Sequence, residues 1–324
     1  KDLHDRYHRH IHEDSDLDAA FCVADALVFM GKAHKGVRLF HEHHRPQSLQ
    51  RTDKVITEER WSAYLQSPDE DALISNLIAA LAPALSRATA RKAKAFDLLP
   101  EDRRDLTTDL LQISRVVAYT SQVLGVGPVD LYVQPDRPQG FLFANTGKVY
   151  SFVAGADLLK GRHQNELTFI VARQLALVKS QYFATNLLLG PAALRQAVLA
   201  AIKLSVPKLP IPKAELEACE SLLKTFNKHL TSREKKQVKA LVSRLVKRGA
   251  VDLASWFREA VLAADRAALF LCQDLFNAAR IVEQSPQVTG APSPAKRIQE
   301  LVRFCLSPEY SELRKQLDLV IGKG

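Results

Sequence analysis

The chain has 324 residues and a net charge of +9, and 47% of its residues are hydrophobic and 25% are charged. This length is enough for two or three domains with a hydrophobic core, and the abundance of Ala and Leu favours helices. The positive charge permits an anionic partner but does not require one.

The four cysteines, Cys22, Cys219, Cys272 and Cys305, lie far apart in the sequence among apolar neighbours. None has the C-x-x-C spacing of a zinc knuckle, and their positions argue against a disulfide framework. We therefore expect buried free thiols in a reducing compartment. The sequence has no recognisable signal peptide and no apolar run of membrane-spanning length, so the expected location is cytoplasmic.

Residues 1–44 have the pattern of two antiparallel helices. Leu3, Tyr7 and Ile11 recur at helical spacing, and a second helix rich in Ala and Val follows them. Small residues on two helices within about 34 residues resemble one tetratricopeptide-type repeat. Residues 45–56 are polar and lack periodicity, so they are predicted to form a linker.

Between residues 57 and 283 the pattern predicts helices on both sides of one small β region. The sequence Ser67-Pro-Asp-Glu70 has the form of a capping box that starts a helix with proline at its first position. Three alternating segments between residues 129 and 154 predict a three-stranded sheet. Residues 284–324 are predicted to form a mobile Ser-, Pro- and Gly-rich loop followed by two short helices.

The segment Asn165–Ser180 has the apolar frame of a metal-binding helix but lacks the metal ligands. In the motif H-E-x-x-H, two His one helical turn apart reach one zinc ion, and the Glu acts as general base. The corresponding positions in this chain are Arg173, Gln174 and Leu177.

Residues 105–280 resemble the HtpX-like gluzincin metallopeptidases. A strand pair, the helix described above and a later helix containing Ala264-Asp-Arg-Ala267 follow one another in the order seen in that family. In the family the later helix carries the third zinc ligand and an Asp that supports a ligand His. The resemblance places Val261 at the third-ligand position and keeps Asp265. It therefore implies a peptidase-like fold with no zinc site and no cofactor.

The residues at these four positions do not suit zinc-dependent hydrolysis. Leu177 and Val261 offer no donor atom, and the guanidinium of Arg173 is a permanent cation. Gln174 has no carboxylate to accept a proton from water. We predict that Arg173 fills the vacated position and pairs with Asp265, because an unpaired buried carboxylate is costly. The alternative is an ordinary amphipathic helix whose likeness to the family is coincidental.

Histidines are concentrated near the start of the chain. His4, His8 and His12 recur one turn apart on one predicted helix face, a spacing that suits a transition metal. No Cys and no clear carboxylate partner completes the set, which favours a solvated helix face and no bound metal.

Residues 233–248 predict a basic amphipathic helix, which the capping box Thr231-Ser-Arg-Glu234 starts and Gly249 ends. Its apolar stripe consists of Val238, Leu241, Val242, Leu245 and Val246. Its cations are Arg233, Lys235, Lys236, Lys239, Arg244, Lys247 and Arg248. Such a helix suits phosphates or an anionic membrane. Because it lacks interleaved aromatic residues for base stacking, a solvated charged face is the favoured interpretation.

Together these patterns predict a mainly α (α+β) protein in which a tetratricopeptide-like hairpin precedes a gluzincin-like pseudo-peptidase domain, residues 57–283. The expected function is a non-catalytic protein-binding or scaffolding module whose partner is a protein or peptide. The predicted peptide-binding edge strand comprises Lys148, Val149, Tyr150, Ser151 and Phe152. The alternatives are a hydrolase with a displaced metal site and a basic-surface binder of nucleic acid or anionic membrane.

Overall fold

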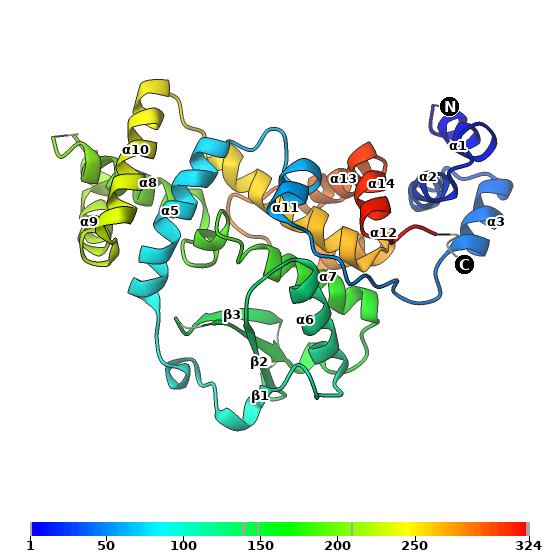
Figure 1. The fold of residues 1–324 in the computed structure, drawn as a ribbon, viewed down its shortest axis with the longest axis horizontal. Coiled ribbons are helices and arrows are strands. Elements are labelled where there is room, and N and C mark those ends of the chain that lie inside the picture. Colours follow the sequence, from blue (N-terminus) through cyan, green and yellow to red (C-terminus); the bar gives the residue numbers. More distant parts are fainter. Residues whose placement is uncertain (1, 138–139, 148, 209, 322–324) are drawn as a thin grey trace.

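The protein is mainly helical and contains one small mixed β-sheet, as Figure 1 shows. The expected fold class is therefore confirmed at this level. The structure, a computed structural model, describes residues 2–137, 140–147, 149–208 and 210–321.

Three helices, and not the expected two, form the N-terminal unit: α1 (Asp2–His12), α2 (Leu17–Phe29) and α3 (Lys35–His44). The second expected helix is interrupted because Gly31 adopts a left-handed conformation with φ of +68°. The His34 side chain then caps α3 by accepting a hydrogen bond from the Val37 amide. The two-helix hairpin is thus corrected to a three-helix unit.

This N-terminal unit is joined to the C-terminal helices by buried contacts. Helix α2 packs against α12 (Leu275–Gln284), α13 (Pro294–Cys305) and α14 (Pro308–Gln316). Arg314 donates two hydrogen bonds to Asp18, at 2.9 and 2.8 Å, and both side chains are 3% exposed. The two ends of the described chain therefore share one interior.

The predicted linker, residues 45–56, has no helix or strand, but it is not detached from the body of the protein. Leu49 and Ile56 are buried in the main core, and the Ile56 amide donates to the carbonyl of Val123. The segment therefore packs as an ordered connection.

Four helices form a bundle at the left of Figure 1: α5 (Ala72–Thr89), α8 (Gly190–Ser205), α9 (Leu216–His229) and α10 (Ser232–Arg248). Contrary to the expectation of no such run, helix α5 is long and apolar enough to span a membrane by length and composition, but it packs against both α9 and α10. Its apolar composition is explained by this burial.

The predicted capping box at Ser67-Pro-Asp-Glu70 is wrong. Asp71 is the N-cap of α5, and its carboxylate accepts from the amides of Leu73 and Ile74. Glu70 instead turns into the core and accepts hydrogen bonds from the hydroxyls of Ser75 and Tyr182. The buried hydrogen bonds to Glu70 thus replace the reciprocal cap that the local pattern predicts.

The sheet has four strands in the described chain, and not three: β1 (Arg103–Arg104), β2 (Val129–Gln134), β3 (Phe141–Asn145) and β4 (Tyr150–Gly155). The spatial order is β1-β2-β4-β3, with β2 parallel to β4 and the other pairs antiparallel. One face packs on the main core, and the other is covered by a smaller cluster that includes Leu98 and Tyr132.

Strand β2 contacts α6 (Gln112–Val123), and β3 contacts α7 (Gln164–Ala176). The remaining helical segments are the short α4 (Glu58–Arg60), a π-helical turn (Trp61–Leu65) and α11 (Leu253–Cys272). Short 3-10 turns occupy Ala93–Phe96, Pro100–Asp102, Ala156–Leu158, Phe183–Asn186 and Lys213–Glu215. Helices α7 and α11 pack against one another at the centre of the molecule.

Candidate functional site

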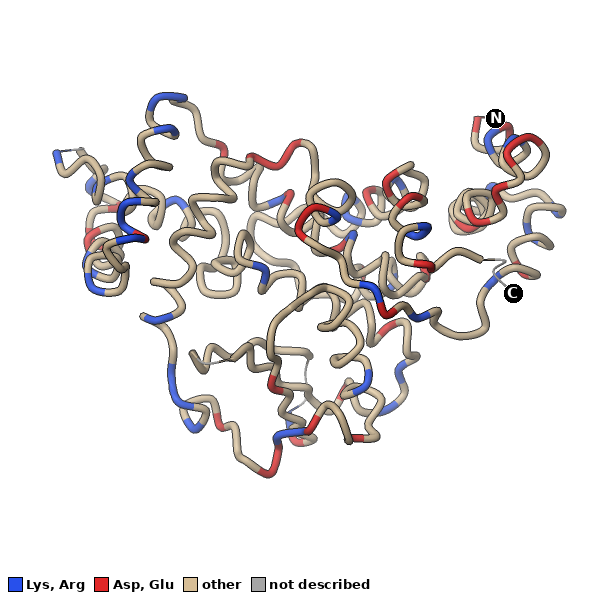
Figure 2. The backbone as a smooth tube through the Cα atoms, in the orientation of Figure 1, with Lys and Arg blue, Asp and Glu red and all other residues tan. Residues whose placement is uncertain are grey.

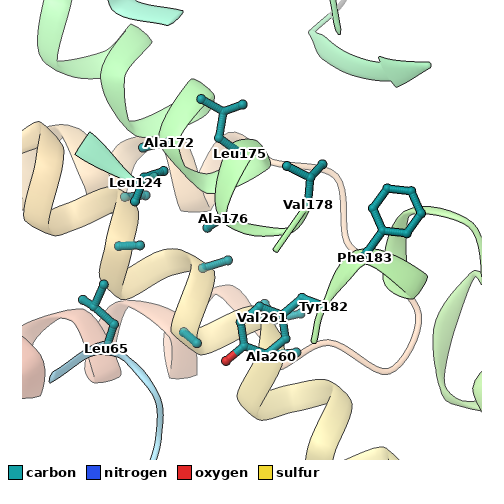
Figure 3. Close-up of a cluster of buried hydrophobic side chains, with 14 of the residues drawn as sticks. Leu65, Leu124, Ala172, Leu175, Ala176, Val178, Tyr182, Phe183, Ala260 and Val261 are labelled. Atoms are coloured by element: carbon teal, nitrogen blue, oxygen red, sulfur yellow. The ribbon is translucent and has the colours of Figure 1, made fainter. Parts of the chain in front are cut away.

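The candidate site lies where α7 packs on α11. Helix α7 begins at Gln164 because the Glu166 carboxylate accepts from the His163 amide and closes a capping box. Ala172 and Ala176 on α7 meet a run of buried Ala on α11, so the helices approach closely. Figure 3 shows apolar side chains of both helices gathered around this contact.

Val261, the expected third-ligand position, belongs to this apolar cluster and is only 5% exposed. Figure 3 shows it near Ala260 and Tyr182, with Val178 and Phe183 on the segment that follows α7. The Val261 side chain packs in the core and has no donor atom for a metal ion.

Arg173 and Asp265 form the predicted ion pair. The Arg173 Nε donates to Asp265 Oδ1 at 2.8 Å. The Asp265 side chain is 1% exposed, whereas that of Arg173 is 20% exposed. The pair that was predicted from the cost of an unpaired buried carboxylate is therefore confirmed.

A second arginine, which the sequence did not identify, completes the arrangement. Arg297 on α13 donates from Nε to Asp265 Oδ2 at 2.6 Å and from Nη2 to Oδ1 at 2.7 Å. This two-pronged contact is the strongest geometry that a guanidinium and a carboxylate can adopt. Asp265 thus accepts three hydrogen bonds from two arginines, and the cluster carries one excess positive charge.

The two guanidinium groups respond differently to this environment. Burial lowers the pKa of Arg173, and the charge of Arg297 lowers it further against the opposing effect of Asp265. Burial also acts to lower the pKa of Arg297, but its two hydrogen bonds to Asp265 outweigh this effect and raise it. Both groups stay protonated at neutral pH, so neither acts as a general base.

Gln174 and Leu177 hold the end of α7. Asn186 lies between them: its Oδ1 accepts from Gln174 Nε2 at 2.7 Å, and its Nδ2 donates to the Leu177 carbonyl at 2.7 Å. The amide of Gln174 is therefore engaged in a structural hydrogen bond. Gln174 and Leu177, at the expected general-base and second-His positions, therefore bind Asn186 and fix the end of α7.

The N-terminal histidines lie among aromatic and backbone partners. His4 hydrogen-bonds the Lys32 carbonyl at 3.0 Å, and its ring stacks on His34 at 5.0 Å. The rings of His8 and His12 stack at 5.9 Å. Within the described stretches, no group of three or more His, Cys, Asp or Glu side chains is arranged to hold a metal ion.

The predicted edge strand is wrong. Tyr150, Ser151 and Phe152 belong to β4, which is bonded to β2 on one side and to β3 on the other. Val149 precedes the strand, and Lys148 lies outside the described residues. A parallel β2–β4 pairing brings β4 into the interior of the sheet, so no added strand can pair with it.

The open edge is β3. Its register pairs Leu142 with Val153, while the Tyr150 amide points away from β3 and donates to Pro128. Backbone groups alternate in direction along an antiparallel strand, so the N–H and C=O of Phe141 and Phe143 point outward. The opposite edge of the sheet is the two-residue β1, which is short and carries two arginines.

The β3 edge borders the candidate site. Strand β3 contacts α7, and the ring of Phe143 packs edge-on against Phe183 at 5.6 Å. Leu142 is 48% exposed on the other side of the strand. The far end is closed, because the Arg91 amide donates to the Asn145 carbonyl at 3.1 Å. The available edge therefore spans Phe141 to Phe143.

The basic helix is α10, and its capping matches the sequence. Thr231 and Glu234 form the capping box, and Gly249 ends the helix with φ of +88°. Val238, Leu241, Val242 and Leu245 are buried, whereas Val246 is 52% exposed. Val246 is therefore removed from the predicted apolar stripe.

Comparisons with protein-family models, with curated proteins and with solved structures found no match to this chain. The likeness of residues 105–280 to the HtpX-like gluzincins therefore stays a hypothesis.

Proposed function

We propose that this protein is a non-catalytic peptide-binding module built on a gluzincin-like frame. The observation that carries the proposal is the buried cluster of Arg173, Asp265 and Arg297 at the place where the resemblance puts a zinc site. A metal ion placed there would face two permanent cations and the apolar Val261. The frame keeps its buried Asp and replaces the metal with guanidinium groups.

A chain with these side chains has no means to activate water at this site. Hydrolysis of a peptide bond requires a nucleophile and a group that accepts its proton. Gln174 is neutral and hydrogen-bonded to Asn186, and the arginines hold their protons. The proposed function is accordingly binding without cleavage.

The β3 edge is the proposed binding surface. Its outward backbone groups at Phe141 and Phe143 match the way an extended peptide adds a strand to a sheet. Main-chain hydrogen bonds supply affinity in this mode, and exposed Leu142 supplies an apolar contact. The N-terminal helices fit a scaffolding role, as a repeat-like unit packed on the same body. A cytoplasmic location belongs to the same proposal.

The experiment uses peptides selected from a random display library on the intact protein, with affinity then measured by fluorescence anisotropy. Two matched variants separate backbone pairing from packing. Phe143→Ala and Phe143→Pro both remove the ring, but only Phe143→Pro removes the outward N–H. We expect the proline variant to bind at least tenfold more weakly than the alanine variant, since about 1.4 kcal/mol corresponds to that factor.

Circular dichroism establishes that both variants are folded before their affinities are compared. Equal affinities of Phe143→Ala and Phe143→Pro would reject β3 as the binding edge. Failure to select any peptide would reject the proposed function itself.

A further inference from the structure

The net charge of the molecule is concentrated in one part of the fold. Residues 190–249, which comprise α8, α9 and α10, contain thirteen Lys and Arg against four Asp and Glu. This excess of nine equals the net charge of the entire chain, so the other residues are balanced at 32 of each sign. Figure 2 shows the resulting run of basic segments over the bundle at the left of the molecule.

Helix α10 presents a row of cations to solvent because its apolar stripe is buried in the bundle. The basic face of α10 comprises the exposed residues Arg233, Lys236, Lys239, Arg244 and Lys247. It extends over about 21 Å, from the helical rise of about 1.5 Å per residue. Among the described residues none of these five side chains forms an ion pair, although ion pairs are frequent elsewhere.

The acidic residue of α10 does not neutralise this face. Glu234 closes the capping box and pairs with Arg87 at 2.6 Å. Neighbouring cations three residues apart, such as Lys236 with Lys239 and Arg244 with Lys247, lie on one helix face and repel one another. A bound polyanion would remove this repulsion.

We propose that the basic face binds the sugar–phosphate backbone of duplex nucleic acid without sequence preference. Five cations in a row of this length match successive phosphates, whose charges screen the repulsion within α10. Exposed Ser232, Gln237 and Ser243 add neutral hydrogen-bond donors of the kind that contact phosphates. This function goes beyond peptide binding at β3 and does not depend on it.

Two other anionic partners fit the face less well. Insertion into an anionic membrane requires large apolar or aromatic side chains beside the cations. The stripe that holds Val238 and Leu245 is buried, and Val246 is the exposed large apolar residue of α10. Single-stranded nucleic acid is disfavoured because the face carries no aromatic ring for base stacking.

The test is fluorescence anisotropy of the intact protein with a labelled duplex of mixed sequence at several salt concentrations. Five phosphate contacts predict an affinity that falls about 500-fold between about 50 and 200 mM salt, at a slope of about −0.9 per contact. Replacement of Lys236, Lys239 and Lys247 by Gln leaves two contacts and reduces this fall to about 10-fold.

The matched control removes three exposed cations at the other end of the molecule, Arg9, Lys35 and Arg38, again to Gln. This variant should keep the fall of about 500-fold, because its substitutions lie on α1 and α3. Glutamine preserves helix propensity, and thermal melting by circular dichroism verifies that each variant is folded.

A wild-type duplex affinity that does not change with salt would overturn the proposal, and that measurement requires no variant. So would an equal effect of the two triple variants, or binding to phosphatidylserine vesicles or polyglutamate without binding to duplex. Phe143→Pro should leave duplex affinity unchanged. The experiments can therefore reject peptide binding at β3 and duplex binding at the basic face independently.

Discussion

Replacement of Asp265 by Asn tests the buried ion cluster that defines the candidate site. The substitution keeps the shape of the side chain but removes the charge that two arginines share. Arg297 would be left 6% exposed without a counterion, while Arg173, at 20% exposed, has partial access to water. Arg297 is therefore expected to bear most of the cost.

Breaking a buried ion pair by removal of one partner costs about 3–5 kcal/mol. We take about 4 kcal/mol as the expected loss in the free energy of unfolding, because one of the two arginines is partly hydrated. With an unfolding entropy of about 2.1 cal/mol/K per residue over 324 residues, this loss lowers Tm by about 6 °C.

Urea unfolding and calorimetry of Asp265→Asn measure both quantities. Asp130→Asn is the matched control: its partner Arg103 is 59% exposed, and an exposed pair is worth about 1 kcal/mol or less. A loss below about 1 kcal/mol for Asp265→Asn would refute the view that this carboxylate is the counterion of the desolvated Arg297 and the partly hydrated Arg173.

Two further predictions concern the core. Burial raises the pKa of Glu70 against the hydrogen bonds it accepts. Between about pH 4.3, where a Glu of the unfolded chain titrates, and the raised pKa, the native protein keeps the Glu70 proton that the unfolded chain has released. The stability that Glu70 confers is therefore lost as the pH rises through this range. The stability of wild type relative to Glu70→Gln, from urea unfolding at several pH values, should fall with rising pH, and a constant difference would contradict this. In α10, Leu245→Ala should cost about 2–5 kcal/mol and Val246→Ala about 0.5 kcal/mol or less, because only Leu245 is buried; equal losses would show that the buried face is misassigned.

The sequence predicted features that follow from short-range rules. The capping box of Thr231 and Glu234 depends on residues three apart, and the extent of α10 follows from its periodicity. The pairing of Arg173 with Asp265 was predictable because a buried carboxylate requires a partner and the family resemblance placed the two residues on adjacent helices.

Features that depend on packing between distant segments could not be predicted in this way. Arg297 lies 32 residues after Asp265, and its own surroundings in the sequence resemble those of any surface arginine on a helix. Strand order is also a long-range property. The alternation of Tyr150 to Gly155 predicts a strand, but it does not predict that β2 pairs with the edge of this strand opposite β3. Glu70 does not cap a helix as predicted, because the hydroxyls of Ser75 and Tyr182 donate hydrogen bonds to its carboxylate in the core.

We propose that the protein binds an extended peptide and does not cleave it. The most direct measurement is the intact mass of a library-selected peptide after prolonged incubation with the protein, with and without added zinc. We predict that the peptide is recovered whole in both samples, because Arg173, Gln174, Leu177 and Val261 supply neither a metal ligand set nor a base. Recovery of fragments that depend on zinc and disappear with a chelator would show that the protein is a metallopeptidase and not a binding module.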